Sequence, residues 1–364
     1  MKFNGGKFRL IGKCLFKMKH NQSFTVRARA PLRIGLAGGG SDISPFCDDF
    51  GGCVVNATID RYAYATIRQR NDAKVCFIAA DKNICESHEN IDSLSNLDGL
   101  SLHRAVYNHA TKRYNSQALI GIDVITHCDA PEGSGLGSSS TLVVAMLKAF
   151  DEYFGCSDSP YEIAQRAYTV ERIDCGMGGG RQDQYSAAFG GVNFMEFGAN
   201  YSARVTPIPM CDFFRCEIEA SLILYFTGLS RDSSKIISDQ SSNIISGNVT
   251  SLGAMHCLAR EATVTRNCLI NRDIIGLAES MRLGWESKKQ SALSVTNTHI
   301  DQIYDAACMN GAIAGKVSGA GGGGFMCFLV PSERRMDVIR VLNKFNGVVG
   351  NCHFVDQGVK SWRL

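Results

Sequence analysis

The hydrophobic pattern of the chain changes repeatedly between strand-like and helix-like segments. Residues 24–36 (FTVRARAPLRIGL) and 118–126 (ALIGIDVIT) alternate apolar positions with other residues, which is typical of half-buried strands. Residues 142–153 instead carry apolar side chains at helical spacing. These patterns predict further strands at 74–80, 190–197 and 219–226, and further helices at 161–174 and 332–345. Because both halves mix strands and helices, we predict an α+β fold.

The length of 364 residues favours two domains over a single core. A strand over 190–197 ends the first mixed segment, and Pro207 and Pro209 precede the next predicted strand. We therefore expect a basic extension at residues 1–22, an N-terminal domain at 23–205 and a C-terminal domain at 206–364.

Four glycine clusters stand out, at residues 35–40, 133–137, 176–180 and 319–324. Their unequal spacing excludes a repeat array. We interpret them as separate loops that converge on one site.

The cluster within PEGSGLGSSS (131–140) lies between the predicted strand 118–126 and the helix that follows. Free backbone amides and the positive end of the helix dipole attract an anion at such a junction. A tight turn with a serine cap is the alternative. The loop is not a Walker A motif, because Ser138 follows Gly137 where that motif has lysine. If it binds phosphate, a metal ion or a distant basic residue must supply the charge.

Two acidic residues are candidates for that chemistry. Glu171 continues the apolar stripe of the helix 161–174, where an unpaired carboxylate is costly to bury, so an Arg or Lys or a metal ion must partner it. Asp183 follows a glycine cluster near the start of a short predicted helix. It either caps that helix or orients and deprotonates an attacking hydroxyl, as an Asp does in kinases.

Arg33 and Asp42 flank the first cluster, GLAGGGS. Arg33 would stabilise a transferred phosphate and the ionised base, and Asp42 would accept hydrogen bonds from sugar hydroxyls. Taken alone, both are equally compatible with ordinary turn or surface positions. The cluster does not match the G-x-G-x-x-G dinucleotide fingerprint.

Charge and composition exclude several classes. The net charge of +3 arises from the first 22 residues, which carry +6 without an acid, so subtracting +6 from +3 leaves −3 for the remainder. Such a body does not indicate nucleic-acid binding. No apolar run predicts a membrane helix, and the 15 cysteines contain no CxxC pair, which favours reduced thiols in a cytoplasm. We interpret the basic extension as a disordered appendage, with a surface-seeking segment as the alternative.

Three segments together resemble the GHMP kinase superfamily of small-molecule kinases. APLRIGLAGGGSD resembles its substrate motif, PEGSGLGSSS its phosphate-binding motif and KVSGAGGGGF its C-terminal glycine motif. The resemblance implies ATP and Mg²⁺ as cofactors. It also implies an N-terminal domain with a left-handed β-α-β crossover and a ferredoxin-like C-terminal domain.

The resemblance also implies roles for individual residues. Asp183 matches the catalytic aspartate and Arg33 the arginine near the transferred phosphate, while Ser139 and Glu171 match the magnesium ligands. The implied ATP-binding residues are Gly133, Ser134, Gly135, Leu136, Gly137, Ser138, Ser139, Ser140, Gly321 and Gly322. The implied substrate-binding residues are Gly39, Gly40, Ser41, Asp42, Arg181, Arg231, Lys288 and Lys289.

Within the superfamily, segments such as GGGRQDQYSAAFGGVNF and GWESKK are similar to the heptose 7-phosphate kinases, and L-fucokinase domains share much of the pattern. A phosphorylated sugar requires a second anion site, for which Arg231, Lys288 and Lys289 are the first candidates. A solvated helix face is the alternative for the two lysines. A non-catalytic sensor that binds ATP and sugar is the alternative of another class, although it would not need Asp183 as a base. Oligomeric state is left open.

Overall fold

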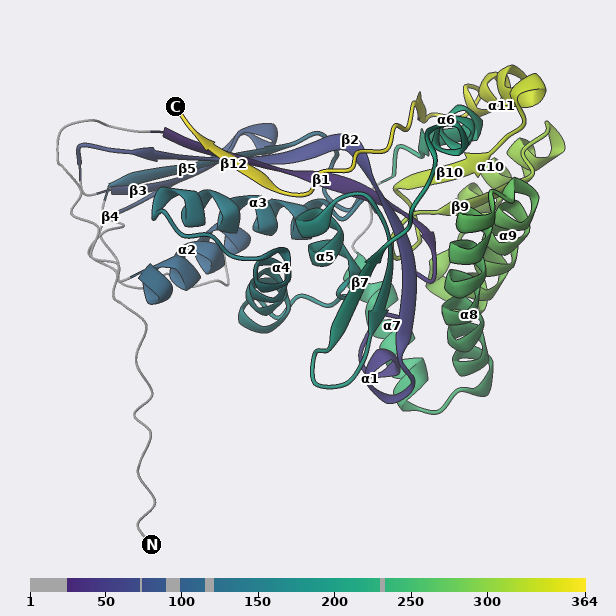
Figure 1. Cartoon of the computed structure of the whole chain (residues 1–364), viewed down its shortest axis with the longest axis horizontal. Helices are drawn as coiled ribbons and strands as arrows, with labels where there is room; N and C mark the ends of the chain where they lie inside the picture. Colours follow the sequence, from purple (N-terminus) through teal and green to yellow (C-terminus); the bar gives the residue numbers. More distant parts are fainter. Residues whose placement is uncertain (1–24, 73, 90–98, 115–120, 230–232) are drawn as a thin grey trace, which may run out of the picture.

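Two β-sheets organise the chain in the computed structural model, which describes residues 25–72, 74–89, 99–114, 121–229 and 233–364 (Figure 1). The basic extension at residues 1–22 and the candidate Arg231 lie outside the described residues. The predicted two-domain α+β fold is confirmed, with a larger sheet built mainly from the N-terminal half and a smaller sheet from the C-terminal half.

The larger sheet has eight strands in the order β12-β1-β2-β5-β3-β4, and β6 and β7 continue from β2. The first half of β2 pairs with β6 and its second half with β5. The strands are β1 (Thr25–Ala37), β2 (Gly52–Gln69), β3 (Lys74–Ala79), β4 (Ile84–Glu89), β5 (Ile122–Cys128), β6 (Val192–Phe197), β7 (Ala203–Pro207) and β12 (Lys360–Arg363).

Helices cover one face of this sheet (Figure 1). Phe77, Val143 and Phe150 are fully buried in the core between them. The helices are α2 (Ser101–Tyr114), α3 (Ser138–Tyr153), α4 (Pro160–Tyr168) and α5 (Gln182–Phe189), while the short α1 (Phe46–Phe50) precedes β2. Among the described strands only β3 and β5 pair in parallel, so the implied left-handed crossover applies to their connection; its hand stays a prediction.

The smaller sheet has the antiparallel order β11-β8-β10-β9. Its strands are β8 (Leu222–Phe226), β9 (Ala314–Val317), β10 (Phe325–Leu329) and β11 (Val348–Gly350). Its helices are α6 (Asp212–Ser221), α7 (Ser233–Ile245), α8 (Val249–Asn271), α9 (Ile274–Ser291), α10 (Thr298–Met309) and α11 (Arg335–Leu342). This order, with helices between β8 and β9 and between β10 and β11, is the implied ferredoxin-like arrangement.

Some predicted boundaries differ from the structure. Residues 219–221, expected to begin a strand, form the last turn of α6, because the apolar strand pattern starts only at Leu222. The helix expected over 161–174 is α-helical only to Tyr168 and continues as a π-helical segment, Thr169–Asp174. The π-helical segment carries Glu171, which is fully buried.

Sheet pairing also crosses the expected domain boundary. Residue 205 lies inside β7, which pairs with β6. The final strand β12 returns to pair with β1 in the larger sheet. The chain therefore leaves the N-terminal domain after β7 and re-enters its sheet at the end. In the part of the chain that is described, no helix combines the length and apolarity needed to cross a membrane.

Candidate active site

A cavity of about 240 Å³ lies between the two sheets' loops. All four glycine clusters contribute to its lining, so the expected convergence is confirmed. We name the loops that contain these clusters the substrate loop (residues 38–42), the phosphate loop (131–140), the loop before α5 (176–181) and the glycine loop (319–324). Helices α7 and α9 complete the lining through residues such as Ile237 and Lys288.

The phosphate loop ends where α3 begins at Ser138. Gly137, the residue before the helix, has φ 76°, and no side chain caps the helix there. The serine hydroxyls are used elsewhere: Ser138 donates to the Pro131 carbonyl, and Ser139 and Ser140 donate to Glu171. The serine-cap alternative is therefore wrong, and the uncapped first turn presents amides that suit an anion.

The glycine loop and the residues next to it pack against the phosphate loop. A side chain at Gly135 would lie 2.3 Å from the Ser318 carbonyl oxygen, so only glycine permits this approach. The Phe325 amide also donates to the Ser134 carbonyl at 2.8 Å. Gly321 lines the cavity, whereas the Gly322 amide donates to the Val295 carbonyl. Among the other expected ATP ligands, Gly133, Gly135 and Ser138 line the cavity, while Ser134, Leu136 and Ser140 are fully buried.

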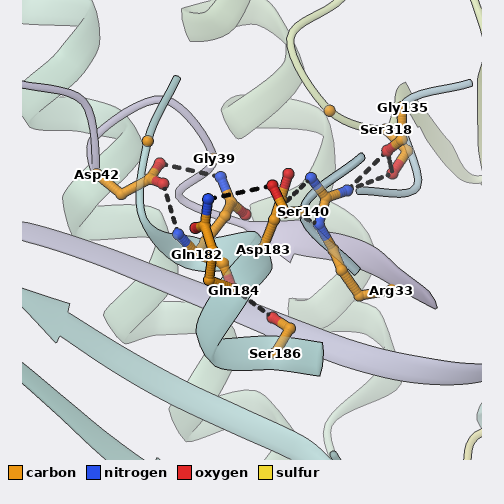
Figure 2. Close-up of polar contacts among 12 residues, drawn as sticks. Arg33, Gly39, Asp42, Gly135, Ser140, Gln182, Asp183, Gln184, Ser186 and Ser318 are labelled. Carbon is orange, nitrogen blue, oxygen red and sulfur yellow. Dashed lines mark hydrogen bonds and ion pairs between the residues drawn. The ribbon is translucent and has the colours of Figure 1, made fainter. Parts of the chain in front are cut away.

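Asp183 and Arg33 form an ion pair at the inner end of the cavity (Figure 2). Arg33 Nε and Nη2 lie 2.7 and 2.5 Å from Asp183 Oδ1, and Nη1 donates to the Gly135 carbonyl at 2.7 Å. Asp183 Oδ2 accepts no hydrogen bond from the described residues. No side chain caps α5, so Asp183 is not its capping residue. Asp183 thus offers one open carboxylate oxygen beside the phosphate loop.

Asp42 lies at the other side of the α5 N-terminus and is almost fully buried. Its Oδ2 accepts from the Arg181 amide at 2.9 Å, and its Oδ1 accepts from the Gly40 amide. The Gln182 amide and side chain also donate to Oδ2 and Oδ1, at 3.0 and 2.9 Å (Figure 2). Asp42 lines the cavity, but these four bonds fix the substrate loop against α5. Its direct contact with a sugar hydroxyl stays a prediction.

Glu171 has the arginine partner that was considered for it, while the metal alternative stays a prediction. Its carboxylate accepts from Ser139 Oγ at 2.8 Å and Ser140 Oγ at 2.6 Å, and Arg172 Nη1 lies 3.3 Å away. Gln184 Nε2 donates to it at 2.7 Å. Ser139 lines the cavity and the fully buried Glu171 carboxylate contacts its hydroxyl, so one carboxylate and one hydroxyl oxygen lie side by side at the phosphate loop. That donor set fits Mg²⁺, which takes few protein ligands and completes its shell with phosphate oxygens and water.

The neighbouring Lys288 and Lys289 occupy opposite environments. Lys288 is buried, lines the cavity, and donates to the Gly39 carbonyl at 2.8 Å and the Gly319 carbonyl at 2.7 Å. Burial, reinforced by the nearby Lys316, lowers the pKa of Lys288 to about 7. Lys289 does not line the cavity and instead pairs with Glu286 at 2.9 Å. The solvated-face alternative therefore holds for Lys289 and fails for Lys288.

Two other expected substrate contacts are held inside the protein. Arg181 is buried, with Nη2 2.6 Å from Asp48 Oδ1 and Nη1 2.8 Å from the Gly198 carbonyl. Ser41 is fully buried and its hydroxyl donates to the Cys53 carbonyl at 2.9 Å. Neither lines the cavity: Arg181 ties the loop before α5 to α1 and to the residue after β6, and Ser41 ties the substrate loop to β2.

A second cavity, of about 190 Å³, adjoins the phosphate loop and shares Ser138, Ser139 and Met177 with the first. Much of its lining is apolar, including Leu100, Leu102 and Leu142. His103 also lines it and donates or accepts a hydrogen bond with Thr126 at 2.8 Å. Burial lowers the pKa of His103 to about 4, so the imidazole is neutral near pH 7.

Comparison with known proteins supports the resemblance. The model of the GHMP kinases N terminal domain matches residues 101–191, and that of the GHMP kinases C terminal domain matches residues 265–348. The chain is 41% identical to the D-glycero-alpha-D-manno-heptose 7-phosphate kinase of Campylobacter jejuni, over 93% of this chain and 99% of that protein. The chain belongs to the GHMP kinases.

Two further similarities bear on this GHMP kinase. A crystal structure described as a D-glycero-D-manno-heptose 1-phosphate kinase from Bacteroides thetaiotaomicron superposes with a TM-score of 0.79 and 39% identity, covering 93% of this chain and 99% of that one. The L-fucokinase/L-fucose-1-P guanylyltransferase of Bacteroides fragilis is 24% identical over 91% of this chain but only 37% of its own length. The predicted similarity to the heptose-phosphate kinases is therefore confirmed.

Sequence reasoning missed several residues of the site. Arg172 lines the cavity and donates to the Gly178 carbonyl at 3.1 Å, and its position directly after Glu171 was the available signal. Gln184, which holds Glu171, stands next to Asp183 in the QDQ triplet. The second cavity gave no signal in the sequence, because its lining comes from separate segments, 79–82, 99–103, 126–142 and Met177, that only the fold brings together.

Proposed function

We propose that this GHMP kinase transfers the γ-phosphoryl group of ATP to the anomeric hydroxyl of D-glycero-D-manno-heptose 7-phosphate. The observation that carries the proposal is Asp183, whose Oδ1 is held by Arg33 while Oδ2 is open beside the uncapped start of α3. An acceptor hydroxyl on Oδ2 would lie next to the loop that receives the phosphates.

ATP would occupy both cavities. The amides at the start of α3 and the phosphate loop suit the phosphates, and the second cavity, which offers the apolar side chains of Leu100, Leu102 and Leu142 beside polar ones, suits the base. Glu171 and Ser139 would hold Mg²⁺, which neutralises charge on the phosphate oxygens when bound.

In the reaction, Asp183 orients the sugar hydroxyl and accepts its proton through Oδ2. Arg33 keeps the carboxylate in place and brings positive charge to the transferred phosphoryl group. Lys288 adds a buried cation beside the substrate loop. Most of the rate acceleration would come from positioning and electrostatic stabilisation, because phosphoryl transfer needs little covalent help from the protein.

The choice of sugar rests on the relatives. The Campylobacter jejuni relative is named for heptose 7-phosphate, and the Bacteroides thetaiotaomicron relative is named as a heptose 1-phosphate kinase. We favour the 7-phosphate as substrate because the anomeric oxygen is then free to accept the new phosphate. The product would be the 1,7-bisphosphate, on the route to GDP-heptose for surface polysaccharide. ATP as donor and the free thiols of the described cysteines suit a cytoplasmic reaction.

One coupled assay of ATP consumption tests the proposal across heptose 7-phosphate, the free heptose, L-fucose and galactose. We expect kcat/KM for the phosphorylated heptose to exceed the others by ~100-fold or more, equivalent to about 2.7 kcal/mol. Efficient turnover of L-fucose without turnover of heptose 7-phosphate would make this chain an L-fucokinase and overturn the substrate assignment. The sugar-kinase chemistry at Asp183 would then remain.

A further inference from the structure

The proposed function requires a second anion site, and the structure narrows where it lies. Of the described cations that line the cavity, Arg33 is engaged by Asp183 and the Gly135 carbonyl, at the end where phosphoryl transfer occurs. Lys288 is fixed to the Gly39 and Gly319 carbonyls in the same region. Both serve the reacting end of the sugar, so the far phosphate needs other partners.

An open groove continues the cavity away from Asp183. It shares with the cavity Ile43, Arg172, Gly176, Met177, Gly178, Gly179, Ser234 and Ile237. Beyond this shared wall the groove is lined by one face of α7, including Lys235, Ser238 and Ser241. A sugar with its anomeric oxygen at Asp183 would therefore extend its other end toward α7.

The two described cations that line the groove, Arg172 and Lys235, differ in how firmly their side chains are held. The Arg172 guanidinium is fixed by the Gly178 carbonyl, Glu171 and Ser140, so it contributes a positive charge at the shared wall. Lys235 is exposed and has no hydrogen-bond or ion-pair partner within the described part of the chain. Its flexible ammonium can therefore reach an anion without losing an existing contact.

The polar groups around Lys235 favour this role. Ser238 lies three residues further along α7 and so on the same face, where it offers a hydroxyl donor. Asp239 is the carboxylate that lines the groove, but its Oδ2 accepts from Ser294 Oγ at 2.7 Å and it forms no ion pair with Lys235. The groove thus has an unpaired ammonium with a hydroxyl donor beside it.

We propose that this groove binds the phosphate at the far end of the sugar, with Lys235 as its principal cation and Arg172 as a fixed charge behind it. The inference rests on the proposed function and specifies how it selects a phosphorylated sugar. It replaces Lys288 and Lys289 as the first candidates for that contact.

The test compares heptose 7-phosphate with the dephosphorylated heptose in wild type, Lys235→Gln and Lys235→Glu. Lys344→Gln is the matched control, because Lys344 is an exposed lysine just after α11 and outside the cavity and groove. We expect kcat/KM for the phosphorylated sugar to fall about tenfold in Lys235→Gln and about 100-fold in Lys235→Glu, because a charge-assisted contact is lost and then reversed. Efficiency with the dephosphorylated heptose should stay within about twofold, and Lys344→Gln should match wild type on both sugars.

Each other outcome has a distinct meaning. If wild type prefers the phosphorylated sugar and both Lys235 variants keep that preference, the groove assignment is wrong while the proposed function stands. Equal losses on both sugars would show that Lys235 supports the site in general and does not read the phosphate. If wild type itself does not use heptose 7-phosphate, the proposed substrate and this inference fail together.

Discussion

The inner and outer ends of the substrate cavity are built in opposite ways. At the inner end, Arg33, Asp42 and Lys288 are buried and nearly every polar atom has a protein partner. At the outer end, Lys235 is exposed on α7 and has no hydrogen-bond or ion-pair partner among the described residues. A fixed inner end suits chemistry, since transfer depends on precise geometry. An open outer end suits selection, since residues there can change without disturbing the fold.

The largest effect is expected at Asp183, at the inner end of the cavity. Asp183→Asn should lower kcat by at least ~100-fold for every sugar, because the general base is lost while the shape of the site is retained. Binding of ATP and sugar, measured by calorimetry, should persist. If the variant kept the wild-type rate, Asp183 would have no part in the mechanism. If wild type itself showed no turnover, the alternative of a non-catalytic protein that binds ATP and sugar would be favoured.

A change at Lys288 tests whether its positive charge contributes to the reaction at the inner end of the cavity. Lys288→Met should lower kcat/KM by about 30-fold, since a hydrogen bond to a charged group contributes about 2 kcal/mol. Lys289→Met is the matched neighbour and should change kcat/KM by less than about twofold, because Lys289 lies outside the cavity and surface pairs contribute little.

The pH profile separates charge from structure at Lys288. With a pKa of about 7, the free enzyme loses this charge as pH rises, so wild-type kcat/KM should fall above about pH 7, whereas that decline should be absent in Lys288→Met. Because the folded pKa lies below that of the unfolded chain, the lysine's contribution to stability rises with pH between these values. If Lys288→Met lowered kcat/KM by the same factor at every pH and also lowered Tm, Lys288 would serve only to hold the substrate loop and the glycine loop together.

A change at Glu171 tests whether this residue is a ligand of Mg²⁺. Glu171→Gln should raise the Mg²⁺ concentration for half-maximal rate by about tenfold or more, since the carboxylate ligand is lost while Ser139 remains. Tm should also fall, because Gln loses the charge that faces Arg172 and its amide NH₂ cannot accept from the surrounding donors Ser139, Ser140 and Gln184, so the Mg²⁺ requirement is the deciding measurement. A variant that melts at lower temperature with unchanged Mg²⁺ dependence would assign Glu171 to the Arg172 ion pair alone.

The smallest effect is expected at the N-terminus. A chain that starts near Ser23 should retain the fold and wild-type kcat/KM, because β1 begins at Thr25 and the described cavity uses no earlier residue. Thermal melting and the coupled assay would measure this. Loss of activity would show that the basic extension contributes to the site, against our interpretation of it as an appendage.

Local sequence patterns were sufficient for several parts of this protein. The position of α3 after a glycine-rich loop followed from periodicity and glycine placement alone, because both are properties of neighbouring residues. The convergence of the glycine clusters and the pairing of Arg33 with Asp183 were expectations that the structure supports. Helix and strand ends were less accurate, as at residues 219–221, where α6 continues into the expected strand.

Tertiary structure decided the environment of each charged residue. In sequence, Lys288 and Lys289 are equivalent neighbours, yet packing against the substrate and glycine loops buries the first and leaves the second beside Glu286. Likewise Asp42 and Asp183 flank the same helix start, but only Asp183 keeps an open oxygen. Some of the deciding partners lie more than a hundred residues away, such as Gly39 for Lys288 and Arg181 for Asp42, so no local pattern can specify them. These partners determine which charged groups remain available for chemistry.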